Sequence, residues 1–129
     1  MRPTRARSRQ AAYRHGHVAE ALATLVLLAK GFHPIARRYR TPLGELDLVV
    51  KRGRTIAFVE VKARALRDEA LDSVGRAAER RIVDAADLWL AQHPAAAGLD
   101  LRYDMVVVTQ WRLPLHLADA FRPGFHKPS

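Results

Sequence analysis

Three charged residues lie within apolar sequence in the middle of the chain. Asp47 occurs in the run GELDLVV, and Glu60 and Lys62 occur in the run FVEVK. Charged side chains are rarely placed in such runs unless they have a partner or a function. Two carboxylates beside an amine can hold a hard divalent cation such as Mg²⁺ or Mn²⁺ and can activate a water molecule. These residues are therefore the first candidates for a metal-dependent hydrolytic site.

Both runs are expected to be β-strands of one hairpin. The apolar and β-branched residues of Gly44–Lys51 and Thr55–Lys62 are typical of strands, and Arg52-Gly53 is the predicted tight turn between them. Side chains alternate along a strand, so Glu60 and Lys62 should share a face.

The register expected for this hairpin does not bring the two carboxylates directly together. Centred on the predicted turn, it places Asp47 nearly opposite residues 55–57, so a bend or bulge is needed to bring Asp47 closer to Glu60. Alternation also places Leu46 and Leu48 on the same face, opposite to that of Asp47.

The spacing alone leaves a plainer interpretation open. A Glu and a Lys two residues apart on an exposed sheet face commonly form a surface ion pair, which contributes less than about 1 kcal/mol. The apolar residues on both sides of each charge favour the functional interpretation over this one.

The remaining elements are expected to cover a mixed sheet with helices. Helical periodicity spans Gly16–Lys30 and Asp72–His93, and further strands are predicted at Phe32–Arg40 and Leu101–Thr109. The order is α-β-β-β-α-β, which is typical of an α/β fold. The second helix connects two strands that should therefore be parallel. Residues 114–121 are predicted to form a last strand that leads into a helical turn.

The length of 129 residues fits a single domain. We expect a disordered basic arm over residues 1–15, the domain over residues 16–121 and a loose tail over residues 122–129. The absence of cysteine excludes disulfides, thiolate zinc sites and a cysteine nucleophile. With no long apolar segment and no visible secretory signal, the sequence favours a cytoplasmic protein that does not enter a membrane.

The charge of the chain favours a polyanionic partner. Twenty-two basic residues face 13 acidic ones, for a net charge of +9, and nucleic acid is the commonest polyanion that such a domain meets. An arginine-rich composition without a binding role is the alternative.

Several further motifs occur together with the two runs. They are Gly16 with Glu20, Arg38-Tyr39-Arg40, Gly44 to Val49, Phe58 to Lys62 with Arg64, Arg102-Tyr103-Asp104, and Leu115 to Phe121. On these motifs the chain resembles the YraN-like family of small bacterial proteins. That family is in turn similar to the PD-(D/E)XK nuclease superfamily and to archaeal Holliday-junction resolvases.

The resemblance implies a restriction-endonuclease-like fold and a nuclease that hydrolyses DNA phosphodiester bonds with Mg²⁺ or Mn²⁺, in repair or recombination. Asp47 and Glu60 match the metal ligands of the superfamily, and Lys62 matches its catalytic lysine. Glu20 matches an additional acidic residue that helps to hold the metal, although its helical position also allows a place on the solvated face.

The resemblance also implies a DNA-binding surface. Arg38, Arg40 and Arg64 are expected to contact phosphates, and the resolvases suggest a homodimer. The chain departs from the family pattern at Arg38, where Asn is common, and lacks a Lys near the start of its second helix. A non-catalytic nucleic-acid-binding module with a nuclease fold, or an adaptor in which the carboxylates are relics, remain the alternatives.

Overall fold

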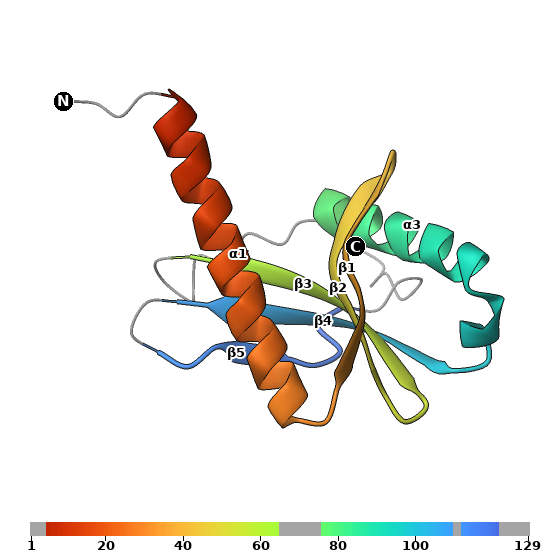
Figure 1. Cartoon of the computed structure of the whole chain (residues 1–129). Coiled ribbons are helices and arrows are strands. Elements are labelled where there is room, and N and C mark those ends of the chain that lie inside the picture. The colour runs from red at the N-terminus through yellow and green to blue at the C-terminus, as the bar shows by residue number, and fades with distance from the viewer. Residues whose placement is uncertain (1–4, 65–75, 110–111, 122–129) are drawn as a thin grey trace.

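A mixed β-sheet lies between two helices in the computed structural model, which describes residues 5–64, 76–109 and 112–121 (Figure 1). The sheet has the strand order β1-β2-β3-β4-β5. Strands β3 and β4 are parallel, as the crossover helix predicts, and the other neighbours are antiparallel. The elements are α1 (Arg5–Ala29), β1 (His33–Thr41), β2 (Gly44–Arg52), β3 (Thr55–Ala63), α3 (Arg76–Gln92), the 3-10 helix η1 (Pro94–Ala96), β4 (Asp100–Val108) and β5 (Leu115–Leu117).

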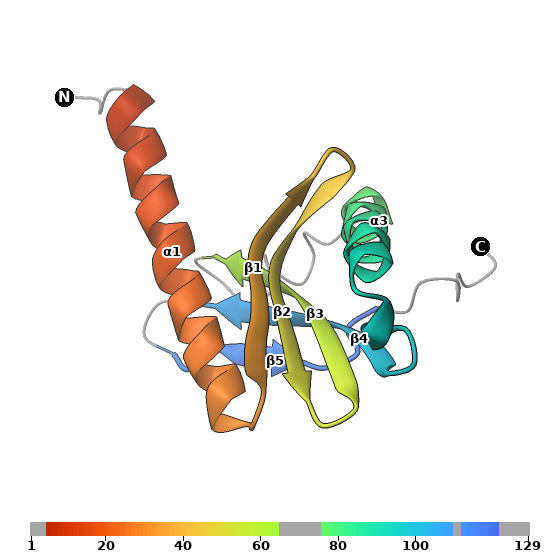
Figure 2. The ribbon, with the colours of Figure 1, turned by 45° about the vertical axis from the view of Figure 1, so that its right-hand side comes forward.

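The predicted α/β architecture is confirmed, and two apolar layers hold it together. On one face Leu27 of α1 packs with Leu48 and Val59, and on the other Trp89 of α3 packs with Phe58. Figure 2 shows α1 and α3 on opposite sides of the sheet. Among the described residues, no helix is long and apolar enough to cross a membrane.

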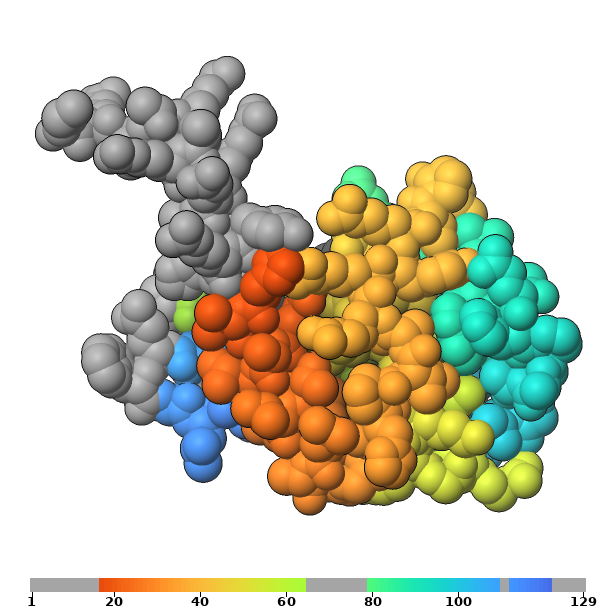
Figure 3. Space-filling model, in the orientation of Figure 1, coloured from red at the N-terminus to blue at the C-terminus, as the bar shows by residue number. Residues whose placement is uncertain are grey.

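The boundaries of the helices differ from those predicted. Helix α1 begins at Arg5 rather than at Gly16, so it includes much of the segment expected to be a disordered arm, and it ends just before Gly31 as predicted. From residue 17 onward it lies at the surface beside β1 (Figure 3). The described part of the second helix begins at Arg76, and residues 72–75 and the predicted tail lie outside the described residues.

The register of the β2–β3 hairpin corrects the one predicted. Arg52 pairs with Thr55, so the two-residue turn is Gly53-Arg54 and not Arg52-Gly53. Gly53 has φ +58, a conformation that glycine adopts without the strain that a side chain would bring. This change moves Asp47 away from residues 55–57, and no bulge is needed to bring it to Glu60.

The tip of the β1–β2 hairpin is pressed against α3. A side chain at Gly44 would collide with the backbone carbonyl of Arg81, so only glycine allows this close approach. This contact holds the first residue of β2 against α3.

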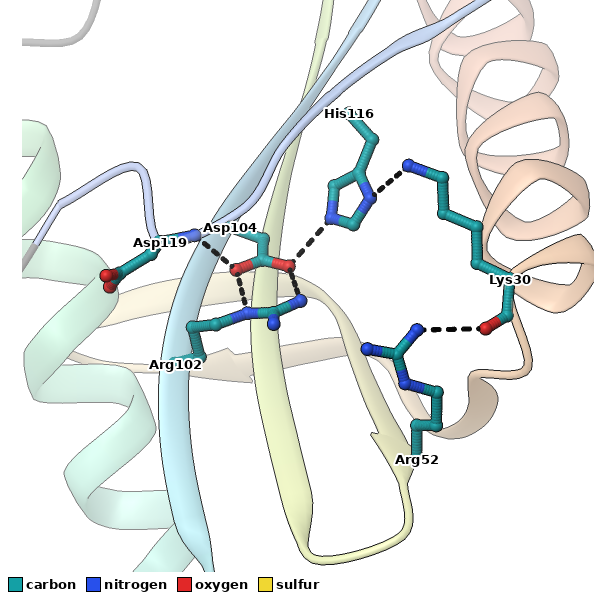
Figure 4. A network of polar contacts seen from close by, with 6 residues as sticks. All are labelled: Lys30, Arg52, Arg102, Asp104, His116 and Asp119. Carbon is teal, nitrogen blue, oxygen red and sulfur yellow. Dashed lines mark hydrogen bonds and ion pairs between the residues drawn. The ribbon is translucent and has the colours of Figure 1, made fainter.

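A buried carboxylate joins β4 to the elements around it (Figure 4). Asp104 is fully buried and accepts two hydrogen bonds from Arg102, at 2.8 and 2.7 Å, and one from the backbone N–H of Asp119 at 2.9 Å. His116 Nε2 lies 2.7 Å from the same carboxylate, and its Nδ1 lies 2.9 Å from Lys30 Nζ. Because an ammonium group can only donate, Nδ1 accepts from Lys30 and Nε2 donates to Asp104.

These donors decide the charge of Asp104. Burial alone would raise the pKa of the carboxyl, but the hydrogen bonds from His116, Arg102 and the Asp119 N–H outweigh it and lower the pKa to about 2. The ionised carboxylate therefore ties β5 and the end of α1 to the centre of the sheet.

We predict that Asp104→Ala lowers the free energy of unfolding by about 3–5 kcal/mol at pH 7, because it leaves the Arg102 guanidinium and the Nε2–H of the buried His116 without their acceptor. Since the pKa of Asp104 is below its ordinary value of 3.8, the part of this contribution that depends on the ionised carboxylate should be lost as the pH falls from about 4 to about 2. Urea unfolding at several pH values measures both effects.

Asp119→Asn is the matched control, because it keeps the backbone donor and Asn tolerates the φ of 55 found there. A loss of stability as large in Asp119→Asn as in Asp104→Ala would contradict the role given to the Asp104 carboxylate.

Candidate active site

Strands β2 and β3 separate at Asp47. Their pairing ends at Leu48 with Val59, whereas β3 remains paired with β4 up to Ala63. On its other side β2 stays paired with β1 as far as Gly44. The sheet therefore forks, and the β1–β2 hairpin curves away from β3 in Figure 2.

The carboxylate of Asp47 occupies this fork. Its Oδ2 accepts a hydrogen bond of 2.8 Å from the backbone N–H of Val61. That N–H lies just past the last β2–β3 pair, so the side chain of Asp47 satisfies a backbone donor that β2 no longer reaches. Asp47 is thereby fixed beside Glu60, the residue that follows the last pair on β3.

The alternation of side chains predicted for β2 fails at the same place. Leu48 packs in the cluster beneath α1, but Leu46, which was predicted to share its face, packs in the cluster beneath α3. The register of β1 places Arg38 opposite Asp47, between the pairs Arg37–Leu48 and Tyr39–Leu46, and Arg38 has a φ of 49. Strands β1 and β2 therefore both depart from regular β-strand geometry at the fork.

The negative charges of Glu60 and Glu20 affect the protonation of Asp47. Burial raises the pKa of Asp47, and the negative charges of Glu60 and Glu20 raise it further, to about 8, against the opposing effect of the Val61 hydrogen bond. A hydrogen bond between the carboxyl groups of Asp47 and Glu60 adds to the increase. Near neutral pH the pair Asp47–Glu60 therefore holds a proton.

Two cations stand next to the acidic residues. Lys62 Nζ lies 3.1 Å from Glu60 Oε1, and both side chains are 18% exposed, so this pair is more enclosed than the surface ion pair considered above. Arg38 Nε lies 2.8 Å from Glu20 Oε2, with side-chain exposures of 28% and 12%. Glu20 lies on the buried side of α1 and not on its solvated face.

The other two predicted phosphate contacts are exposed. Arg40 lies on β1, with its side chain 74% exposed and its Nε 3.6 Å from Glu45. Arg64 follows β3, and its guanidinium donates to the carbonyl of Ala63. Arg38 is thus the one of the three that the structure brings to the acidic cluster, through Glu20.

The donor set fits a hard divalent cation. Asp47 and Glu60 supply carboxylate oxygens, which Mg²⁺ and Mn²⁺ prefer, and a cation bound between them would take the place of the shared proton. Within the described ranges, no three His, Cys, Asp or Glu side chains converge as a ready metal site. Glu20 is the predicted third ligand, and here its carboxylate is held by Arg38.

Two features of the molecule escaped the sequence reasoning. The N–H of Val61 that fixes Asp47 carries no signal in the sequence, because every non-proline residue has such a donor. The Asp104–His116 pair does leave a signal, since Asp104 is a charged residue within the apolar run YDMVVV, which the same reasoning that identified Asp47 would have singled out.

Comparison with known proteins places the chain among similar bacterial sequences. The model of a family described as "Uncharacterised protein family UPF0102" matches residues 19–108, a range that contains Glu20, Asp47, Glu60 and Lys62. The chain is 49% identical over 114 residues to the UPF0102 protein of Mesorhizobium japonicum, covering 88% of this chain and 91% of that protein. It is 52% identical over 113 residues to the UPF0102 protein of Methylorubrum extorquens, covering 88% of each.

We predict that Asp47→Asn removes a pH dependence of stability. The pKa of Asp47 is about 8 in the folded protein against an ordinary value of 3.8, so the folded state keeps a proton that the unfolded state has lost. The free energy of unfolding of the metal-free protein should therefore fall as the pH rises from about 4 to about 8. Asn cannot ionise, so the variant should gain stability relative to the original protein over this range.

Urea unfolding in the presence of a chelator at pH 5 and pH 8 measures this effect. Asp100→Asn, at an exposed position at the start of β4, is the matched control and should not change the pH dependence. An equal difference between Asp47→Asn and the original protein at both pH values would contradict the raised pKa.

Proposed function

The chain belongs to the uncharacterised family UPF0102, and we propose that it is a divalent-metal-dependent nuclease that hydrolyses DNA phosphodiester bonds in the cytoplasm. The observation that carries the proposal is the position of Asp47, held by the N–H of Val61 beside Glu60 and Lys62. These are the residue types that metal-assisted phosphodiester hydrolysis requires.

Each residue has a distinct task in this proposal. Asp47 and Glu60 hold Mg²⁺ or Mn²⁺, and Glu20 assists them from α1. The ion, when bound, polarises the phosphate and lowers the pKa of a water molecule. Lys62, held at the site by its contact with Glu60, orients that water or stabilises the negative charge that develops on the phosphate.

The proposed substrate agrees with the charge of the chain. The net charge is +9, Arg40 is exposed on β1, and Arg64 is exposed just after the end of β3. Arginine forms forked hydrogen bonds with phosphate oxygens, which position a DNA backbone without reading its sequence. We assign these two residues, together with Arg38, to the phosphates on either side of the scissile bond.

We predict that the protein cleaves branched, single-stranded or duplex DNA in the presence of Mg²⁺ or Mn²⁺. Asp47→Ala and Lys62→Met should each reduce the rate about a hundredfold or more, because one removes a metal ligand and the other a catalytic group. Lys51→Met, on β2 away from the fork, is the matched control and should retain the activity. Labelled DNA of the three kinds, resolved on denaturing gels, gives the rates.

The same experiment separates the proposal from its alternative. Cleavage that survives in both Asp47→Ala and Lys62→Met would refute the mechanism. Salt-sensitive DNA binding without cleavage, unaffected by chelator and by Asp47→Ala, would instead identify a non-catalytic nucleic-acid-binding module.

We further propose that the protein is a homodimer through the outer face of α1. Between residues 18 and 29 every exposed residue of this helix is apolar, including Val18 at 59% and Leu25 at 61% exposure. An uncharged surface of this kind marks an interaction site and gives DNA nothing to bind. On a chain with a net charge of +9, it is also a place where a second copy meets no like charge.

Leu25→Lys should convert the dimer into a monomer, because it places two like charges in the interface. Leu101→Lys, which changes a 40% exposed leucine on β4, should leave the dimer intact. Light scattering coupled to gel filtration gives the mass of each variant. An original protein that is monomeric at every concentration would rule out the dimer without bearing on the nuclease proposal.

A further inference from the structure

Arg38 forms an ion pair with one of the acidic residues at the fork. Its Nε lies 2.8 Å from Oε2 of Glu20, the carboxylate assigned above as the third metal ligand. Glu20 is only 9% exposed and comes from α1, whereas Arg38 comes from β1, so the ion pair joins the helix to the forked part of the sheet. A carboxylate so enclosed needs a cation or a set of donors near it, and in this structure Arg38 supplies the cation.

The backbone at Arg38 is unusual as well. Its φ of 49 lies in the left-handed region, which is strained for a residue other than glycine. The register of β1 and β2 puts this residue opposite Asp47, at the point where β2 leaves β3. Strain of this kind persists only where the surroundings impose it, and here they present the guanidinium to Glu20.

Two cations could therefore neutralise the carboxylate of Glu20, namely Arg38 and a divalent ion bound at the fork. Glu20 lies near enough to Asp47 for its charge to act on that group, so a divalent ion beside Asp47 would also attract Glu20. A guanidinium released from Glu20 would be a partly exposed cation next to the metal, which is where a phosphodiester must lie for hydrolysis.

We propose that Arg38 is an exchangeable counter-ion, which holds Glu20 when the site has no metal and moves to a DNA phosphate when a divalent cation takes Glu20. This inference rests on the proposed function. It adds a positioning residue, Arg38, that couples the binding of the metal ion to the binding of DNA. Metal and DNA both favour the state in which Arg38 has left Glu20. Each therefore increases the affinity for the other, as thermodynamic linkage requires.

The first test is the affinity of the metal-free protein for Mn²⁺, measured by calorimetry without DNA. Arg38→Asn should bind Mn²⁺ about fivefold more tightly or better than the original protein, because Glu20 no longer has a competing partner. Asn is chosen because it tolerates the left-handed φ, and Arg38→Gly is a second variant that accepts the same backbone. Arg54→Asn, at the turn between β2 and β3, makes the same change in net charge and should leave the affinity unchanged.

A double-mutant cycle separates competition for Glu20 from simple charge repulsion. In the Glu20→Gln background, the gain from Arg38→Asn should disappear if Arg38 acts by occupying Glu20. An undiminished gain in that background would overturn the proposal, because the effect would then come from the positive charge of Arg38 alone.

The coupling to DNA is tested in the Lys62→Met background, in which cleavage is expected to be lost. A short DNA duplex should tighten Mn²⁺ binding when Arg38 is present and should have a smaller effect in Arg38→Asn. Mn²⁺ binding that depends on Asp47 but is unchanged by Arg38→Asn would overturn this inference and leave the nuclease proposal standing. Mn²⁺ binding that does not depend on Asp47 would overturn both.

Discussion

The hydrogen bond from the Val61 N–H to the Asp47 carboxylate is the interaction on which the candidate site depends. At this point β2 leaves β3 and follows β1, and the fork leaves a backbone donor of β3 without its ladder partner. A side chain with an acceptor at position 47 satisfies that donor. The same bond fixes Asp47 beside Glu60, so the break in the sheet and the assembly of the acidic pair have one cause.

The charged side chains around the fork balance one another. Arg38 balances Glu20, Lys62 balances Glu60, and a proton remains with Asp47. The three carboxylates are thus matched by two cations and one proton, and the cluster is neutral. A divalent ion in place of that proton would leave one net positive charge. Under the proposed function, that charge would be complementary to a phosphodiester and would strengthen its binding.

The sequence was sufficient for the architecture because the relevant signals are local. The apolar runs around Asp47 and Glu60 indicate strands, and the helical periodicity of Asp72–His93 implies the parallel pairing of β3 with β4. The geometry of the site depended on one detail, the position of a two-residue turn. Placing the turn at Arg52-Gly53 rather than Gly53-Arg54 displaces every cross-strand pair. The predicted register therefore did not show that Asp47 and Glu60 are adjacent. The positive φ of Arg38 and the break in alternation at Leu46 arise from tertiary packing, which strand periodicity does not include.

Asp47 and Asp104 show why burial of an acidic residue does not by itself indicate function. Asp104 receives hydrogen bonds from two side chains and one N–H, and its pKa is lowered to about 2, so it stays ionised and serves the fold. Asp47 receives one N–H and faces two other carboxylates, and its pKa is raised to about 8. A carboxyl group with fewer donors than its charge requires is the one that gains most from a metal ion. By that criterion Asp47, which keeps a proton because it has too few donors, is a better candidate for the proposed metal ligand than the ionised Asp104.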